Sequence, residues 1–354
     1  MRKTILYIGW VGFGNHGDDV CHAIFTNLTA KLAQPHQLKL EIKALFPSNF
    51  NEYSLARINP DLVVLGAGSL FEPVYLKPLI LAQQQGIPTM IWGSGYDSLA
   101  PSATAFKVAP DSAYMIRQVV GKADVAGIRG RWTQSMLDQI GAYNPLLEIS
   151  GDPGLLLDQP GQPLTEVKAI DKPIIGVNWG TAANRVYGGN EARTVEALAR
   201  FLRELSKDYV IVIYPVWARD IQPCQELAAL IGEKNRIITL DRLPSIEELI
   251  SLYQKAKLTI NMKLHANVFS AASNCPFIAL AYRSKCFDFA DSVGMSDFAI
   301  SFAAPNLDQE LNTAVTKLIN HNDEYREELR QHVQGYRSKL ISLTQSAIEL
   351  LLEG

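Results

Sequence analysis

Residues 258–283, LTINMKLHANVFSAASNCPFIALAYR, contain an apolar run, a stretch of small residues and a second apolar run. The runs at 258–262 and 277–283 have the length of buried strands, and 265–274 between them predicts a helix. A strand–helix–strand unit of this kind joins two parallel strands of one sheet. Near-continuous apolar strands are typical of parallel sheets that helices cover on both faces. The segment therefore predicts an α/β fold.

The same alternation of strands and helices extends through the rest of the chain. Further strands are expected at 5–11, 38–45, 62–68, 89–95, 124–130, 174–180, 209–216 and 236–241. Further helices are expected at 18–33, 75–86, 111–121, 131–141, 190–207, 219–232, 245–256 and about 322–353. We expect two doubly wound, Rossmann-like parallel-sheet domains that face each other across a cleft.

Composition predicts where the two domains meet. Residues 158–173, DQPGQPLTEVKAIDKP, are rich in Pro, Gly and charge and lack hydrophobic periodicity, which is typical of a linker. We therefore expect an N-terminal α/β domain at 1–160 and a C-terminal α/β domain at 172–320. The remainder, 321–354, is expected to form a helical tail near the junction.

Length and composition exclude several classes of protein. The chain has 354 residues, of which 47% are hydrophobic and 19% charged, so it can bury a sizeable core. Its 33 Lys and Arg and 36 Asp and Glu give a net charge of −3, unlike a general nucleic-acid binder. No apolar run is long enough for a transmembrane segment, and no signal-peptide cleavage site follows the basic start, so we expect a cytoplasmic protein. Peripheral contact with a membrane is compatible with this composition.

The cysteines do not predict a metal site or a disulfide framework. None is spaced as in a zinc motif, and we expect free, buried thiols at Cys21, Cys224, Cys275 and Cys286. We accordingly expect no bound metal and no cofactor.

The first strand leads into a glycine-rich loop, GFGNHGDD (12–19), whose glycines let the backbone approach a ligand closely. Its spacing matches neither a dinucleotide-binding motif nor a P-loop. Asp18 and Asp19 suit a sugar hydroxyl or the role of a base, and Asn15 and His16 are candidate contacts to an acceptor. The alternative is a capped β–α turn in which the two carboxylates complement the helix dipole.

Aromatic side chains follow the same pattern at the fourth strand. Trp92 and Tyr96 lie beside the small residues that end this strand, so they are candidates to stack on a sugar ring. The alternative is that both aromatics pack at the domain interface.

Cationic side chains follow three other strands. Arg129 ends the fifth strand between glycines, Lys263 follows LTINM, and Lys285 follows FIALAYR. Because parallel strands present their carboxyl ends to one edge, these cations predict a site for a small, highly charged anion. His265, at the start of a helix beside Lys263, is the candidate catalytic acid or base. The alternatives are an interdomain salt bridge for Arg129 and a structural role for His265.

Taken in order, five segments resemble the polysaccharide pyruvyl transferase family. They are GFGNHGDD, DLVVLGAGSL (61–70), GIRGRWTQSMLDQIG (127–141), ISGDPGLLL (149–157) and INMKLHANVFSAASNCPFIALAYRSKCFDFADSVGM (260–295). The resemblance covers about residues 5–295. The last segment is the most distinctive, since it contains a basic residue, Leu264, His265, a small-residue helix, Tyr282 and Lys285 in the family's order.

The resemblance implies a glycosyltransferase-B-like fold and a specific reaction. It implies transfer of the enolpyruvyl-derived group of phosphoenolpyruvate to a sugar or glycan, including a lipid-linked precursor, as a pyruvate ketal. Arg129, Lys263 and Lys285 would then bind the donor, mainly from the C-terminal domain, and His265 with Asp18 or Asp19 would move protons. No metal is required for this reaction.

The chain departs from the family pattern at three positions. Lys263 stands where the family has Arg, Gly130 where it usually has an acidic residue, and His16 where it has an apolar one. Lys cannot reproduce the bidentate geometry of Arg, so the donor site differs in detail. Two other functions remain open at this stage: a glycosyltransferase of the same fold that uses a nucleotide-sugar, and a non-catalytic protein that binds a sugar or an anion.

Overall fold

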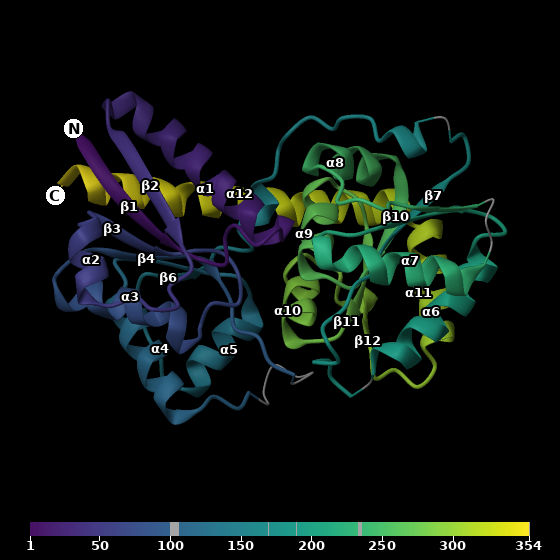
Figure 1. Ribbon diagram of the computed structural model, residues 1–354, viewed down its shortest axis with the longest axis horizontal. Helices are drawn as coiled ribbons and strands as arrows, with labels where there is room; N and C mark the ends of the chain where they lie inside the picture. Colours follow the sequence, from purple (N-terminus) through teal and green to yellow (C-terminus); the bar gives the residue numbers. More distant parts are fainter. Residues whose placement is uncertain (100–105, 169, 189, 233–235, 354) are drawn as a thin grey trace.

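The computed structural model describes residues 1–99, 106–168, 170–188, 190–232 and 236–353. Within these residues the chain forms two six-stranded sheets, each entirely parallel and flanked by helices (Figure 1). The first sheet has the order β2-β1-β3-β4-β5-β6 and the second the order β12-β11-β10-β7-β8-β9. The predicted fold of two doubly wound parallel-sheet domains is therefore confirmed.

The strands follow the apolar runs of the sequence. Those of the first sheet are β1 (Arg2–Ile8), β2 (Lys39–Leu45), β3 (Leu62–Leu65), β4 (Thr89–Ser94), β5 (Val125–Ile128) and β6 (Leu147–Ile149). Those of the second are β7 (Ile174–Asn178), β8 (Val210–Tyr214), β9 (Ile237–Thr239), β10 (Ala256–Asn261), β11 (Phe277–Ala281) and β12 (Ala299–Ser301). Every predicted strand overlaps an observed one. β6 and β12 were not predicted, because each is a three-residue edge strand with little apolar pattern.

The helices alternate with the strands. They are α1 (His16–Ala33), α2 (Glu52–Ile58), α3 (Pro73–Gln84), α4 (Pro110–Lys122), α5 (Arg131–Gln139), α6 (Glu191–Leu205), α7 (Ile221–Ile231), α8 (Ile246–Lys255), α9 (Leu264–Ala272), α10 (Ser284–Ser292), α11 (Leu307–Asn320) and α12 (Asn322–Glu353). The sequence analysis missed α2, α10 and α11. None of the helices in the described residues combines the length and apolarity that crossing a bilayer requires.

Alternate side chains of the first sheet fill two separate cores. Leu6 and Ile8 face a core with α3, α4 and α5, whereas Ile5 and Tyr7 face a core with α1 and α12. The period of two in a strand explains this division, since neighbouring side chains point to opposite faces. The second domain has a core of its own, and all four cysteines are buried and free, as expected.

The C-terminal helix α12 connects the two domains. Its Leu329 and Val333 pack in the core of the second domain, and Leu343 and Ile348 pack against the first sheet. Figure 1 shows this yellow helix running behind both domains. The tail therefore lies at the junction, as the sequence predicted. The first six strands fall within residues 2–149 and the last six within 174–301, and the boundaries 1–160, 172–320 and 321–354 stay predictions.

The carboxyl edges of the two sheets meet across the interface. The His16 amide of α1 donates to the Val216 carbonyl that follows β8, with an N–O distance of 3.1 Å. On the other side, the Ser284 amide donates to the Ser98 carbonyl at 3.0 Å. Loops that follow strands of both sheets thus enclose one space between the domains.

Candidate active site

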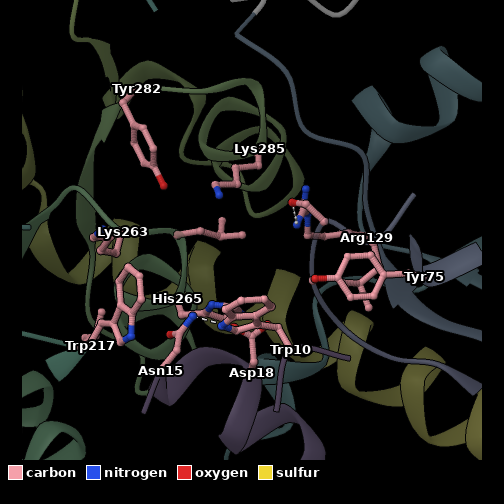
Figure 2. A pocket seen from close by; sticks show the side chains of 15 residues that line it. Trp10, Asn15, Asp18, Tyr75, Arg129, Trp217, Lys263, His265, Tyr282 and Lys285 are labelled. Carbon is pink, nitrogen blue, oxygen red and sulfur yellow. Dashed lines mark hydrogen bonds between the residues drawn. The ribbon is translucent and has the colours of Figure 1, made fainter. Parts of the chain in front are cut away.

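A cavity of about 250 Å³ lies between the two carboxyl edges (Figure 2). The first domain contributes to its lining Trp10, Asn15, Asp18, Ser69, Tyr75 and Arg129, and the second contributes Trp217, Lys263, His265, Tyr282 and Lys285. Six of the ten residues that the sequence singled out are therefore brought together here. They are Asn15, Asp18, Arg129, Lys263, His265 and Lys285.

The glycine-rich loop places Asp18 in the cavity. Gly12 and Gly14 have φ angles of +88° and +68°, a left-handed conformation that favours glycine. Asn15 caps α1 by accepting from the Gly17 amide at 3.1 Å, and its Nδ2 donates to Asp18 Oδ2 at 2.6 Å. Burial raises the pKa of Asp18 to about 7, against the attraction of Lys285. Asp18 can therefore exchange a proton near neutral pH.

Arg129 is a buried cation at the end of β5. Its side chain is only 1% exposed, and Gly95 allows its close approach, since a Cβ there would lie 2.5 Å from Cζ. One terminal nitrogen donates to the Tyr96 carbonyl at 3.1 Å, while Nε is buried without a partner. Among the residues that the structure describes, no Asp or Glu forms an ion pair with Arg129. The buried carboxylate of Asp288 interacts with this charge without forming an ion pair, and the unpartnered Nε makes Arg129 a candidate anion-binding group.

Lys285 approaches the same space from α10. Its Nζ lies 3.2 Å from Asp97 Oδ2, and Asp97 also pairs with Arg283 at 2.9 Å. Burial opposes the charge on Lys285, but Asp97, Tyr282 and Cys286 together outweigh burial and hold the lysine pKa above its usual range. One carboxylate thus faces two cations, and part of the positive charge remains for a ligand.

Lys263 lines the cavity, but its ammonium group already has partners. Nζ donates to the Thr181 carbonyl at 2.6 Å and lies 3.3 Å from the buried carboxylate of Asp220. Burial lowers the pKa of Lys263, and Asp220 opposes that shift. Figure 2 shows this amine on the side of the cavity away from Arg129. Its charge contributes less to an anion site than the sequence pattern suggested.

His265 lies in the first turn of α9 and packs directly against α1. A Cβ on Gly17 would come within 1.8 Å of His265 Nδ1, so this contact requires glycine. Burial lowers the pKa of His265, Asp152 raises it, and the cations Arg129 and Lys285 lower it further. In the absence of an anion, these groups favour the neutral imidazole.

Four predicted site residues do not line the cavity, and the structure gives a reason for each. Trp92 was wrongly expected to stack on a sugar, because it is fully buried against α12 and donates to Thr344 Oγ1 at 3.0 Å. Tyr96 packs on Phe106, and it reaches the site only through its carbonyl.

The other two stabilise the loop that carries Asp18. Asp19 accepts from the Gly12 amide at 2.7 Å and so stabilises the loop, whereas the residue that caps α1 is Asn15. His16 Nε2 lies 2.6 Å from the Pro244 carbonyl and joins the domains. Neither side chain is among those that line the cavity.

Besides Tyr282, which the sequence analysis named only in the family motif, three aromatic residues of the cavity lining were not predicted as acceptor contacts. Trp10 and Tyr75 come from the first domain and Trp217 from the second. Trp10 and Trp217 follow strand ends, a signal that the sequence contained, whereas Tyr75 lies inside α3 and carried none. Figure 2 shows Trp217 on the Lys263 side of the cavity and Tyr75 on the Arg129 side, so these aromatic side chains line different sides of the cavity.

Solved structures with a similar fold are distant from this chain in sequence. Among solved structures, S. aureus MnaA in complex with UDP has a TM-score of 0.64 at 14% identity, covering 92% of this chain and 90% of that one. UDP-GlcNAc 2-epimerase from Neisseria meningitidis, bound to UDP-GlcNAc, has a TM-score of 0.62 at 10% identity over all of both chains. Glycyrrhiza uralensis UGT73P12 has a TM-score of 0.60 at 11% identity, covering 100% and 97%. These likenesses show a glycosyltransferase-B-like fold.

The sequence comparisons identify the family itself. No curated protein matches. The family model of polysaccharide pyruvyl transferase, however, matches residues 12–284, which include every residue of the candidate site except Trp10 and Lys285. The chain therefore belongs to the polysaccharide pyruvyl transferase family.

Proposed function

We propose that the protein transfers the enolpyruvyl-derived group of phosphoenolpyruvate to a sugar of a polysaccharide or glycan precursor, forming a pyruvate ketal. The observation that carries this proposal is Arg129, a buried guanidinium without an ion pair among the described residues, in a cavity that Lys285 also lines. Phosphoenolpyruvate is a small anion with both a phosphate and a carboxylate. Its charge matches a site built from a planar guanidinium and an ammonium group.

The proton transfers of ketal formation match two titratable groups of the cavity, His265 and Asp18. Protonated His265 gives its proton to the methylene carbon of the donor, and a sugar hydroxyl attacks the neighbouring carbon. Asp18 accepts the proton of that hydroxyl. Loss of phosphate and attack by a second hydroxyl complete the ketal, so one acceptor proton ends on the new methyl group and the other on phosphate. The cations stabilise the leaving phosphate.

The acceptor sugar binds, in this proposal, beside Asp18 and among the aromatic side chains of the cavity. Trp10, Tyr75 and Trp217 offer ring faces and edges to the apolar side of a pyranose, and Asn15 offers a polar contact. This replaces Trp92 and Tyr96 in the predicted acceptor site. Attachment of the acceptor to a lipid stays a prediction.

The test is a comparison of two reactions. Purified protein is incubated with phosphoenolpyruvate and a panel of galactosyl or mannosyl acceptors, and released phosphate is measured together with the product's ketal methyl signal by NMR. In parallel, nucleotide release from UDP-sugars is measured. Acceptor-dependent phosphate release with ketal formation is expected. Nucleotide release without phosphate release would instead indicate a nucleotide-sugar glycosyltransferase, and neither release a binding protein.

Arg129→Ala tests the site directly. We expect kcat/KM for phosphoenolpyruvate to fall tenfold or more, because a lost charge-assisted hydrogen bond costs about 1.5–3 kcal/mol. The matched control is Arg131→Ala, which removes an exposed guanidinium two residues away and should leave the kinetics unchanged. Equal kinetics for the two variants would contradict the assignment of the anion site.

A further inference from the structure

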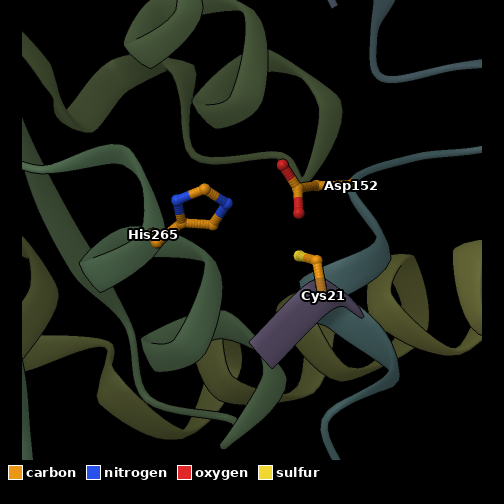
Figure 3. A group of neighbouring side chains, drawn as sticks. All are labelled: Cys21, Asp152 and His265. Carbon is orange, nitrogen blue, oxygen red and sulfur yellow. The ribbon is translucent and has the colours of Figure 1, made fainter. Parts of the chain in front are cut away.

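Behind His265 lies a buried cluster in which two polar atoms have no hydrogen-bond partner. Cys21 of α1, Asp152 and His265 place a ligand atom each within 4.8 Å of the others (Figure 3). Asp152 is fully buried at the start of the short 3₁₀ turn Pro153–Leu156. Its Oδ1 accepts from the Gly154 amide at 2.9 Å, whereas Oδ2 has no hydrogen-bond partner. His265 Nε2 is likewise buried and without a partner.

Two unsatisfied polar atoms in one buried cluster call for an explanation. Burying an unpaired carboxylate oxygen or ring nitrogen costs free energy. This cost falls when the ring nitrogen carries a proton that the carboxylate attracts. Figure 3 shows one ring nitrogen of His265 turned toward Asp152 and Cys21. Since Nε2 is the buried nitrogen, Nδ1 is the one available to the cavity that His265 lines.

We propose that Asp152 is a positioning residue that holds the proton of His265 on Nε2 and thereby makes Nδ1 the nitrogen that exchanges a proton with the substrate. Its catalytic consequence rests on the proposed function. In that reaction the Nδ1–H bond of the imidazolium breaks, the electron pair of the donor's double bond forms the new C–H bond, and the neutral ring keeps its proton on Nε2. Asp152 stabilises the proton on Nε2 both in the imidazolium and in the neutral ring that remains after the transfer.

The other charged groups around the ring make this carboxylate necessary. Arg129 at the end of β5 and Lys285 of α10 disfavour a protonated ring, and so does burial. Cys21 faces the ring from α1, and Asp18 of the same helix lines the cavity beside it. Asp152 is the group that favours the imidazolium among those that shift its pKa. The carboxylate therefore lets a buried histidine beside two cations carry a proton.

Asp152→Asn tests the proposal, because Asn keeps the size of the side chain and its capping bond to the Gly154 amide. The protein is labelled with ¹³C-histidine, and the His265 signal is assigned by its absence in His265→Gln. An NMR titration then gives the pKa of His265. Removing the carboxylate should lower this pKa by about one unit or more. The basic limb of the kcat–pH profile should move to lower pH, so the activity deficit should shrink as pH falls.

The controls separate the alternatives. Cys21→Ala removes the third member of the cluster and should leave the titration and the pH profile unchanged. An unaltered His265 pKa in Asp152→Asn overturns the proposal, as does an activity loss that is equal at every pH. Stoichiometric zinc in the purified protein that both variants lose would also overturn it, since the cluster would then be a metal site. The titration needs no substrate, so its outcome is independent of whether the protein forms ketals.

Discussion

At the scale of single residues, Asp18 connects the chemistry of the site to the stability of the fold. Burial raises its pKa in the folded state from the ordinary value of 3.8 to about 7. Asp18 therefore ionises at lower pH in the unfolded chain than in the folded one. As a result, the contribution of Asp18 to the stability of the fold is lost as pH rises from about 4 to 7. Asp18→Asn removes this loss while it removes the proposed base.

We expect Asp18→Asn to be more stable than the natural protein at pH 8, by on the order of 4 kcal/mol, and to lose most of its activity. The stability difference should be small at pH 4 and grow up to about pH 7. Denaturant unfolding of both proteins at pH 4, 6 and 8 measures it. Asp19→Asn, which changes the neighbouring carboxylate bonded to the Gly12 amide, is the control. A stability difference that does not grow with pH would contradict the burial of Asp18.

The residues of the site also show how far sequence reasoning reaches. Asp18, Arg129, His265 and Lys285 were found because each follows a strand, and parallel strands bring their carboxyl ends together. The same rule gave a wrong prediction for Trp92, because this residue lies within β4 and not after it. The alternation of side chains along the strand directs Trp92 toward α12. The partners of Lys263 were also invisible, since Asp220 is remote in sequence and approaches only in the folded chain. The catalytic and binding roles of Asp18, Arg129, His265 and Lys285 stay predictions.

At the scale of elements, the approach of α1 to α9 depends on one missing Cβ. Gly17 lies in α1, and an alanine there would place its Cβ within 1.8 Å of His265 Nδ1. Relief requires the ring to turn or the helices to separate. We expect Gly17→Ala to lower kcat at least tenfold and to lower the melting temperature.

The matched control is Gly335→Ala in α12, where a new Cβ meets no atom within 4 Å. Because alanine favours a helix over glycine by about 1 kcal/mol, this variant should gain stability and keep its activity. The two variants make the same chemical change in two helices with opposite expected signs. Full activity in Gly17→Ala would show that the α1–α9 contact does not set the position of His265.

Elements were more predictable than their packing. The βαβ rhythm is a local property that predicted two parallel-sheet units, and an apolar stripe predicted the tail helix. The edge strands β6 and β12 and the helix α10 depend on tertiary contacts, such as the Asp288 carboxylate of α10 that accepts from the Trp132 amide of α5 at 2.9 Å. This hydrogen bond also joins the two domains. The sequence of α5 or of α10 taken alone does not predict it.

At the scale of the whole molecule, the proposed donor site is shared between the domains. Arg129 belongs to the first domain and Lys285 to the second, and Asp97 of the first already pairs with Arg283 and Lys285 of the second. An anion held by both cations would join the domains more firmly. Phosphoenolpyruvate should therefore raise the melting temperature, with a stabilisation of about 2.7 kcal/mol at a hundred times its Kd.

This stabilisation should require both sides of the cavity. Differential scanning fluorimetry with increasing phosphoenolpyruvate, at constant ionic strength, should give a saturable shift for the natural protein and for Arg131→Ala. Arg129→Ala and Lys285→Ala should each lose most of it, although their cations lie on different domains. Inorganic phosphate should give a smaller shift, since it lacks the carboxylate. If Lys285→Ala keeps the full shift while Arg129→Ala loses it, the donor binds to the first domain alone, and the site does not depend on both domains.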